Sequence, residues 1–305
     1  MELSNLRKEL KAHAKVNLFL AVGKTDEKGY HILNTVFQPL DLSDKIMLEE
    51  RMSKGVVLKS NWEIPLGEKN SVHKAVKLMC QEAEKSMSDA RLSIFIHKRI
   101  PLSSGLGGSA VDAAPVIREL DSRWNTGLAD KEMEVVASMV GADVPQALHN
   151  DATYAERYGD EIVSHYSLPR RYVCIYVPRE YMSEHKMKTA ALYSMIDSER
   201  NEKRDEAVRM RKCLMKKALE AKNWNAIGRL MHNDFEFVAF KRYPSLRRVK
   251  ELLLEKGAYG ALLAGSGGAV FGVFETPELS LSASDAICSS VGISEFGQII
   301  LTETL

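Results

Sequence analysis

The stretch Pro101-Leu-Ser-Ser-Gly-Leu-Gly-Gly-Ser-Ala-Val-Asp112 decides how the first half of this chain folds. Before it, Leu92, Ile94 and Ile96 alternate with other residues, which predicts a strand. After it, residues 113–124 have the spacing of an amphipathic helix. A glycine-rich turn that opens a helix presents free backbone N–H groups and the positive end of the helix dipole. This arrangement is typical of a phosphate site.

A tight turn that only helps the strand and helix to pack is the simpler alternative, and the glycines alone do not exclude it. The stretch is not a Walker A loop, because no Gly-Lys-Ser/Thr follows, and it lacks the Gly-x-Gly-x-x-Gly of dinucleotide-binding turns. A second glycine run, Gly265-Ser-Gly-Gly268, precedes a strand-like apolar segment. It is either a loop that closes over a phosphate or a bulged turn.

Composition sets limits on the class of protein. The chain has 305 residues, 45% of them hydrophobic, and a net charge of +1, which suits one large or two moderate globular domains. The charge balance gives no reason to expect nucleic acid or an anionic membrane as a partner. No apolar run has membrane-spanning length, and residues 1–10 lack a signal-peptide core. We expect a cytoplasmic protein with four reduced, mostly buried thiols, Cys80, Cys174, Cys213 and Cys288.

Periodicity along the rest of the chain predicts further elements. Alternation over Lys15–Val22 predicts a strand with Lys15 and Asn17 on one face. A strand over 172–177 would begin a second domain. Helices are expected over 71–87 with Ser71 as N-cap, 131–140 closed by Gly141, a short turn from Asp143-Val-Pro145, 198–222, and 223–240.

Three sets of residues are candidates for chemistry. Asp143 is either an N-cap or a base that accepts a hydroxyl proton. Lys15 is either solvent-facing or a site cation that would hold a nearby carboxylate in its ionised form. Tyr30 and His31 follow a turn and either stack on and hydrogen-bond a nucleobase or pack in the ordinary way.

Taken in order, these motifs resemble those of the GHMP kinases. Pro101–Ala110 matches that family's Pro-x-x-x-Gly-Leu-Gly-Ser-Ser-Ala motif, and Ala264–Phe274 matches its C-terminal glycine motif. Within the family, the chain resembles the branch that phosphorylates a diphosphocytidyl derivative of methylerythritol on the non-mevalonate route to isoprenoid precursors. The matching segments, in register from about residue 12 to 275, are Ala14–Leu20, Gly29–His31, Asn70–Ala75, Lys98–Pro101, Gly141–Pro145 and Asn233–Glu236.

The resemblance implies an α+β fold of two domains. Residues 1–168 would form a ribosomal-protein-S5-like domain that carries the ATP-binding glycine loop, and residues 169–305 a ferredoxin-like domain. ATP, with Mg²⁺, and the acceptor would meet in the cleft between them. The expected protein is an ATP-dependent small-molecule kinase, monomeric or homodimeric, without a nucleic-acid or membrane partner.

The resemblance also implies roles for individual residues. Asp143 and Lys15 would be catalytic, and Ser109 would contact the metal. ATP would be bound by Asn70, Lys98, Pro101, Ser103, Ser104, Gly105, Leu106, Gly107, Gly108 and Ser109. The acceptor would be bound by Asn17, Tyr30, His31, Gly265, Ser266 and Gly267.

The chain departs from the branch pattern at several positions. Ala110 and Val111 replace two serines, and Ala264 replaces a serine of the third motif. Pro115 falls inside the expected helix, where it would cost about 3 kcal/mol or force a kink. The segment 179–189, expected near the cytidine, is unfamiliar. The alternatives are a GHMP kinase for another small alcohol such as homoserine, a mevalonate derivative or a sugar, a mevalonate-diphosphate decarboxylase, and a non-catalytic binding protein on the same fold.

Overall fold

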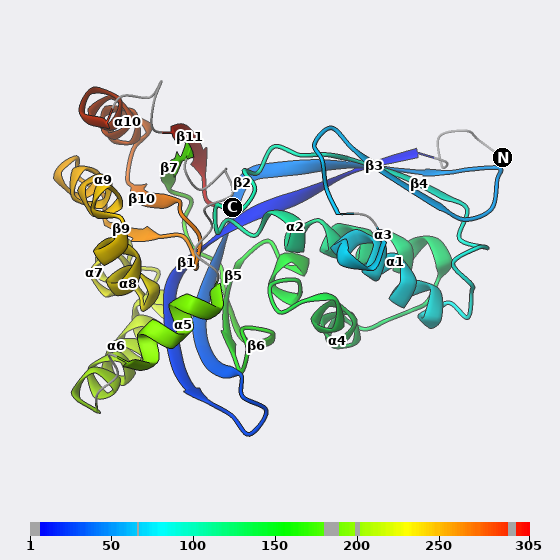
Figure 1. Cartoon of the computed structure of the whole chain (residues 1–305), viewed down its shortest axis with the longest axis horizontal. Coiled ribbons are helices and arrows are strands. Elements are labelled where there is room, and N and C mark those ends of the chain that lie inside the picture. The colour runs from blue at the N-terminus through cyan, green and yellow to red at the C-terminus, as the bar shows by residue number, and fades with distance from the viewer. Residues whose placement is uncertain (1–6, 66, 180–188, 199–201, 292–296) are drawn as a thin grey trace. The chain divides into compact units, whose positions relative to one another are not determined.

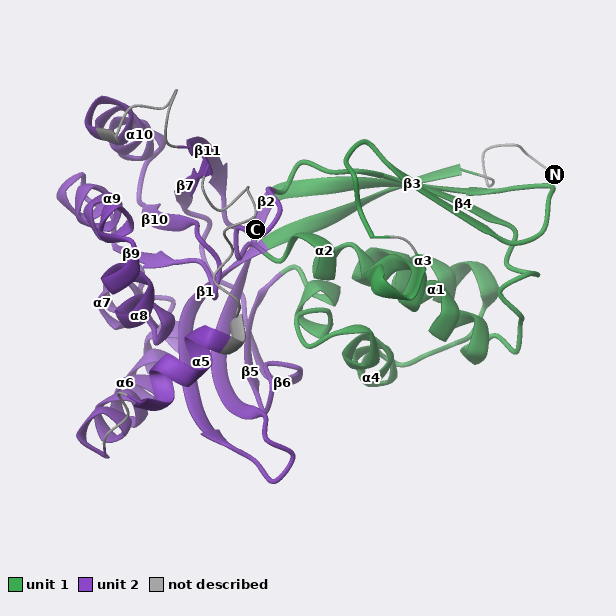
Figure 2. Cartoon of the chain, viewed as in Figure 1, with its two compact units in different colours: residues 1–14, 42–100, 107–150 green, residues 15–41, 101–106, 151–305 purple. Residues whose placement is uncertain are grey.

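The computed structural model describes residues 7–65, 67–179, 189–198, 202–291 and 297–305 (Figure 1). Strands and helices are mixed throughout, which confirms the α+β class. The chain forms two compact units (Figure 2). Unit 1 comprises residues 1–14, 42–100 and 107–150, and unit 2 comprises residues 15–41, 101–106 and 151–305. The two units are not continuous along the sequence, so they do not test the predicted boundary between domains at residue 168, which stays a prediction.

Two long strands contribute to both units. Strand β1 runs over Arg7–Thr25 and strand β2 over His31–Glu50. The strand predicted for 15–22 is therefore confirmed, and it is longer at both ends. Every residue of β1 from Ala14 to Val22 is buried, so both faces of this part of the strand are covered.

Unit 1 is a sheet with helices on one face (Figure 1). Strand β4 (Leu92–His97), predicted from its alternation, pairs with β2 on one side and with β3 (Val56–Ser60) on the other. The helices are α1 (Ser71–Glu82), α2 (Gly108–Val111), α3 (Ala113–Trp124) and α4 (Asp130–Val140), with short 3₁₀ turns η2 (Gly67–Lys69) and η3 (Pro145–Leu148).

The ends of these helices correct several predictions. The N-cap of α1 is Asn70 and not Ser71, because the Asn70 side chain accepts the backbone N–H groups of the first turn. Gly141 ends α4, but its backbone is extended (φ 175°) rather than left-handed. Pro115 lies inside α3 as expected, but without the expected cost. The helix is interrupted at Asp112, so Pro115 lies in the first turn of α3, where its missing N–H leaves no intrahelical bond unmade.

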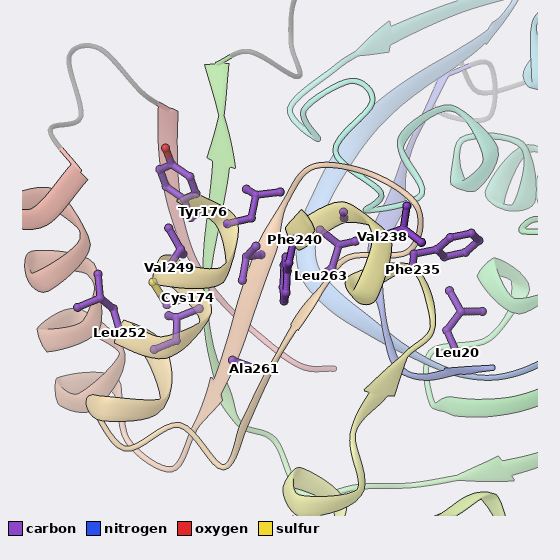
Figure 3. Close-up of a cluster of buried hydrophobic side chains, with 14 of the residues drawn as sticks. Leu20, Cys174, Tyr176, Phe235, Val238, Phe240, Val249, Leu252, Ala261 and Leu263 are labelled. Carbon is purple, nitrogen blue, oxygen red and sulfur yellow. The ribbon is translucent and has the colours of Figure 1, made fainter. Parts of the chain in front are cut away.

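Unit 2 contains a four-stranded antiparallel sheet in the order β11-β7-β10-β9. Its strands are β7 (Tyr172–Pro178), β9 (Gly260–Leu263), β10 (Val270–Phe274) and β11 (Gly297–Glu303). Helices α9 (Pro244–Glu255) and α10 (Pro277–Val291) lie along one face of it (Figure 1). The core between them includes Cys174, Val249, Leu252 and Leu263, and it extends to Leu20 of β1 (Figure 3).

The remaining elements of unit 2 surround its parts of β1 and β2. Strand β5 (Ala152–Glu156) pairs with β2 and with β6 (Glu161–Tyr166). Helices α5 (Thr189–Ser198) and α6 (Glu202–Glu220) follow, and α6 confirms most of the charged helix expected at 198–222. The single helix expected over 223–240 is wrong. The chain there forms α7 (Trp224–Leu230), strand β8 (His232–Asn233) and α8 (Phe235–Arg242), because β8 pairs in parallel with β1.

Two further expectations concern the state of the cysteines and the absence of a membrane-spanning segment. All four cysteines are free, but only Cys80 and Cys174 are buried, and Cys213 is exposed. Within the described ranges, no helix combines the length and the apolar composition needed to cross a membrane.

Candidate active site

Three buried polar side chains in unit 2, Lys15 and Asn17 of β1 and Thr35 of β2, form a hydrogen-bonded row. The Lys15 ammonium donates to the Asn17 Oδ1 atom at 2.9 Å, and the Asn17 amide donates to the Thr35 hydroxyl at 2.8 Å. Thr35 in turn donates to the carbonyl of Phe19. Lys15 is only 4% exposed, and it also lies over the ring of Phe37 at 5.2 Å. The hydrogen bond between Lys15 and Asn17 shows that the two side chains lie on the same face of β1, as predicted. It also fixes the direction of the Lys15 ammonium.

The first part of the glycine loop, residues 101–106, belongs to the same unit. The Lys15 backbone N–H donates to the Leu106 carbonyl at 3.0 Å, which ties the loop to β1. Ser104 is buried, and its hydroxyl donates to the Pro101 carbonyl at 2.7 Å, so this hydroxyl is used inside the loop. Ser103, by contrast, is exposed with φ 60°.

The second glycine run packs against this loop through the backbone. Gly105 has φ +87°, and a Cβ there would lie 1.8 Å from the carbonyl oxygen of Ala264. A Cβ at Gly267 would lie 2.3 Å from the Gly105 nitrogen. The Ala269 N–H donates to the Ser104 carbonyl at 3.1 Å. Only glycine permits this close approach, which gives both glycine runs a structural reason within unit 2.

The second part of the loop belongs to unit 1. Gly107 is left-handed (φ 89°) and is the N-cap of α2. Ser109, in the first turn of α2, is exposed, and its carbonyl accepts a hydrogen bond from the Ser71 hydroxyl. Of the three serines of the loop, Ser103 and Ser109 therefore have exposed side chains, whereas Ser104 does not.

Lys98 is buried beneath α2, with 1% of its side chain exposed. Its ammonium donates to the carboxylates of Asp44 and Asp112, the latter at 2.8 Å, and to the Gly108 carbonyl at 3.0 Å. Asp44 also accepts the backbone N–H of Ile100 at 2.8 Å. These bonds connect the end of β4 to the start of α2. Lys98 thus supports the glycine loop from below, a contribution that the sequence did not predict.

Asp112 has an unusual environment in this cluster. Burial, to which the nearby Asp44 carboxylate adds, raises the pKa of Asp112 to about 8 despite the opposing Lys98 ammonium. Its Oδ1 atom is buried and has no hydrogen-bond partner among the described residues.

Two other predicted site residues lie in unit 1. The Asn70 carbonyl oxygen Oδ1 accepts from the Val72 and His73 N–H groups and caps α1, and the amide of the same side chain donates to the Pro65 carbonyl. Asp143 is partly exposed and precedes η3, whose cap residue is Val144. The N-cap position of η3 falls on Val144, one residue after Asp143, and the role of Asp143 as a base stays a prediction.

Tyr30 and His31 take different environments at the start of β2. Tyr30 is 63% exposed and contacts the ring edge of Tyr158. The His31 Nδ1 atom lies 2.9 Å from the Gly23 carbonyl and must donate to it, because a carbonyl only accepts. The His31 ring stacks on Tyr193 of α5 at 4.6 Å between centroids. Tyr193 was missed in the sequence, where it lies in a helix without a recognised motif.

The comparisons with known proteins agree with this geometry. The family model described as GHMP kinases N terminal domain matches residues 70–151, and the model described as GHMP kinases C terminal matches residues 215–293. A curated protein of Caldicellulosiruptor bescii is 32% identical over 297 residues, which cover 97% of this chain and 98% of that protein. The chain therefore belongs to the GHMP kinases.

The names of the relatives are more specific than the family. The Caldicellulosiruptor bescii protein is a 4-diphosphocytidyl-2-C-methyl-D-erythritol kinase. A solved 4-(cytidine 5'-diphospho)-2C-methyl-D-erythritol kinase is 27% identical, with a TM-score of 0.74 over 97% of this chain and 99% of its own. A homoserine kinase from Cytophaga hutchinsonii is 18% identical, with a TM-score of 0.78 over 99% of this chain and 96% of its own, which shows the common fold alone.

Each unit thus brings together a part of the predicted site. In unit 2, Lys15 and Asn17 lie beside Gly265, where a Cβ would be 3.6 Å from both side chains. Ser266 and Gly268 belong to the same loop. Part of the unfamiliar segment at 179–189 lies outside the described residues. The residues that the sequence did not reveal are Thr35, Asp44, Asp112 and Tyr193, and Asn233 and Glu236 were recognised only as part of a matching segment, without a role.

Proposed function

We propose that this protein transfers the γ-phosphoryl group of ATP to a hydroxyl group of 4-diphosphocytidyl-2-C-methyl-D-erythritol. The main support is the relationship over nearly the whole chain to kinases that bear this name. The buried row of Lys15, Asn17 and Thr35 beneath a glycine loop supports the same chemistry.

Lys15 and Asn17 serve the transferred group in this proposal. Phosphoryl transfer requires mainly positioning and neutralisation of charge on the phosphoryl oxygens. A buried ammonium held by Asn17 cannot reorient freely, so it is ready to stabilise that charge without reorganisation. Asn17 would also contact the acceptor.

Asp143 is the proposed base. Its carboxylate would accept or orient the proton of the acceptor hydroxyl. Its partial exposure beside η3 leaves the carboxylate accessible to an acceptor. Lys15 belongs to unit 2 and Asp143 to unit 1.

The glycine loop is the proposed ATP site. Gly107, with φ 89°, opens α2 so that the backbone N–H groups of Gly108 and Ser109 have no carbonyl partner within the helix. Backbone N–H groups at such a turn suit the phosphates of a nucleotide. Mg²⁺, when bound with ATP, neutralises phosphate charge, and the exposed Ser109 hydroxyl fits as its contact in this chain.

Tyr30 and His31 are the proposed cytosine-recognition residues. With His31 Nδ1 committed to the Gly23 carbonyl, Nε2 is the ring nitrogen left for a base edge, although it also lies 3.4 Å from Asp197. The exposed Tyr30 ring offers a face on which a base can stack. These two residues separate the proposal from kinases whose acceptors have no nucleobase.

The test is product analysis with purified protein, ATP, Mg²⁺ and the diphosphocytidyl acceptor. The proposal expects one ADP and one monophosphorylated acceptor per turnover, seen by mass spectrometry and phosphorus NMR. Release of phosphate together with CO₂ from mevalonate diphosphate would identify a decarboxylase instead. Nucleotide binding without turnover of any acceptor would identify a binding protein.

A further inference from the structure

The segment Asn233–Glu236 resembles the family branch but has no role in the chemistry proposed above. In unit 2, His232 and Asn233 form strand β8 beside β1, with Asn233 opposite Leu20. Phe235 and Glu236 begin α8. The segment therefore begins beside β1, the strand that carries Lys15 and Asn17.

Asn233 uses its whole side chain to hold the loop that follows β9. It is 3% exposed. Its amide donates to the carbonyls of Leu263 and Gly265, each at 2.8 Å. Its Oδ1 accepts the Phe235 N–H at 2.9 Å, which fixes the orientation of the carboxamide. The two carbonyls lie at the last residue of β9 and inside the second glycine run.

Glu236 binds the same residue at the end of β9, Leu263, through its N–H group instead of its carbonyl. The Leu263 N–H donates to Glu236 Oε1 at 2.9 Å, and Lys250 holds the second carboxylate oxygen at 2.6 Å. Both backbone groups of Leu263 are thus bound by side chains of one short segment. Leu263 itself is in the core, close to Phe235 and Val238 (Figure 3).

The loop held in this way borders the proposed site. A Cβ at Gly265 would lie 3.6 Å from Lys15 Nζ and 3.6 Å from Asn17 Oδ1, and one at Gly267 would meet the backbone of Ser104. A shift of the loop by about 1 Å would therefore change the backbone beside Lys15 and Asn17 as well as the first glycine loop. Misplacement of this size can cost about 100-fold in rate.

We infer that Asn233 is a positioning residue for phosphoryl transfer, which acts by fixing the Gly265–Gly268 loop against Lys15 and Asn17, with Glu236 as its second anchor. The inference rests on the proposed kinase function. The position requires a carboxamide, because the carbonyls of Leu263 and Gly265 both accept from the Asn233 NH₂ group, which has two N–H donors. Aspartate has nearly the same shape but would place a carboxylate oxygen against them.

The test compares Asn233→Asp with Asn223→Asp as a matched control. Asn223 caps α7 and only accepts, from the Ala226 N–H, so aspartate there keeps the bond. For Asn233→Asp we expect kcat to fall about 30- to 100-fold while the number of ATP sites per chain stays that of wild type. The ratio of ADP formed to acceptor phosphorylated should rise, because a misplaced acceptor lets water compete. Asn223→Asp should match wild type in all three.

Amide hydrogen exchange of residues 263–271 gives a readout that does not depend on the acceptor. The loop amides of Ala264, Gly267 and Ala269 are hydrogen-bonded, and we expect them to exchange at least tenfold faster in Asn233→Asp alone. Unchanged exchange would overturn the inference whatever the acceptor is. So would a kcat that falls only in proportion to lost ATP sites. Wild-type protein without activity on the diphosphocytidyl acceptor would instead reject the proposed function.

Discussion

At the scale of single residues, the structure separates side chains that are used within the fold from those that are available to a ligand. Asn70, Lys98 and Ser104 each have their polar atoms bonded inside one unit. Ser103, Ser109 and Tyr30 are exposed. Asn70, Lys98 and Ser104 therefore shape the glycine loop and its surroundings. Contacts of these three side chains with ATP stay predictions.

Asp143→Asn should reduce turnover about 10²- to 10⁴-fold, because it removes the proposed base. The change from carboxylate to carboxamide keeps the size of the side chain, so the fold should be kept. Initial rates and ATP titration of the same preparation measure both effects. Turnover close to that of wild type would show that another group accepts the proton.

Tyr30→Ala should raise KM for the cytidyl acceptor about tenfold or more with a smaller change in kcat, since base stacking is worth about 1–3 kcal/mol. Tyr30 is largely exposed, so the substitution should cost little stability. Steady-state kinetics measures the two constants. An unchanged KM would place the cytosine elsewhere.

His31→Ala should weaken discrimination between cytosine and uracil, because that choice depends on hydrogen bonds to the base edge. His31 is held by the Gly23 carbonyl and by stacking on Tyr193, which orients its Nε2. The measurement is the ratio of kcat/KM for the cytidyl acceptor to that for its uridyl analogue. The same ratio in variant and wild type would contradict this role.

At the scale of elements, the glycine loop depends on backbone geometry. Gly107→Val should abolish ATP binding, because a branched side chain disfavours φ 89° and blocks close approach to the phosphates. Gly127→Val is a suitable control, since Gly127 also has positive φ (+71°) but has no atoms within 4 Å of its Cβ position. ATP titration of both folded variants tests this. Equal affinities would place ATP away from the loop.

The Lys98 cluster under α2 predicts a pH dependence of stability. The pKa of Asp112 is higher in the folded chain than its ordinary value near 4, so the folded state binds the proton more tightly than the unfolded state. The contribution to stability is fully present below about pH 4 and is lost as pH rises to about 8. Asp112→Asn should therefore gain stability relative to wild type as pH rises through this window.

Urea unfolding of wild type and Asp112→Asn at pH 5 and pH 8.5 measures that difference. The free energy of unfolding of the variant minus that of wild type should be larger at the higher pH. A difference that is constant or decreases with pH would show that Asp112 is ionised in the folded chain throughout.

At the scale of the whole molecule, local patterns predicted what local forces determine. The alternation of β4, the shared face of Lys15 and Asn17, and helix α3 follow from neighbouring residues alone. The pairing of β8 with β1, which breaks the helix expected at 223–240, joins residues more than 200 positions apart. Periodicity contains no information about such contacts.

The same limit applies to the candidate site. Its glycines and its Lys15 were recognisable as motifs. The partners that hold them lie far away in the sequence: Asp44, which holds Lys98, is in no recognised motif, and Asn233, which holds Gly265, is in a matching segment whose role the sequence does not show. Only the fold shows that they are buried and fully hydrogen-bonded, which is the signal that identifies them.

The most direct test of the central claim is the ratio of kcat/KM for 4-diphosphocytidyl-2-C-methyl-D-erythritol to that for acceptors without a nucleobase, homoserine and mevalonate, measured with ATP and Mg²⁺. A site that recognises cytosine through Tyr30 and His31 should favour the cytidyl acceptor by at least about 1,000-fold. Tyr30→Ala should reduce that ratio without affecting the smaller acceptors. A wild-type enzyme that phosphorylates homoserine or mevalonate as well as, or better than, the cytidyl acceptor would contradict the proposed substrate and leave only the family assignment.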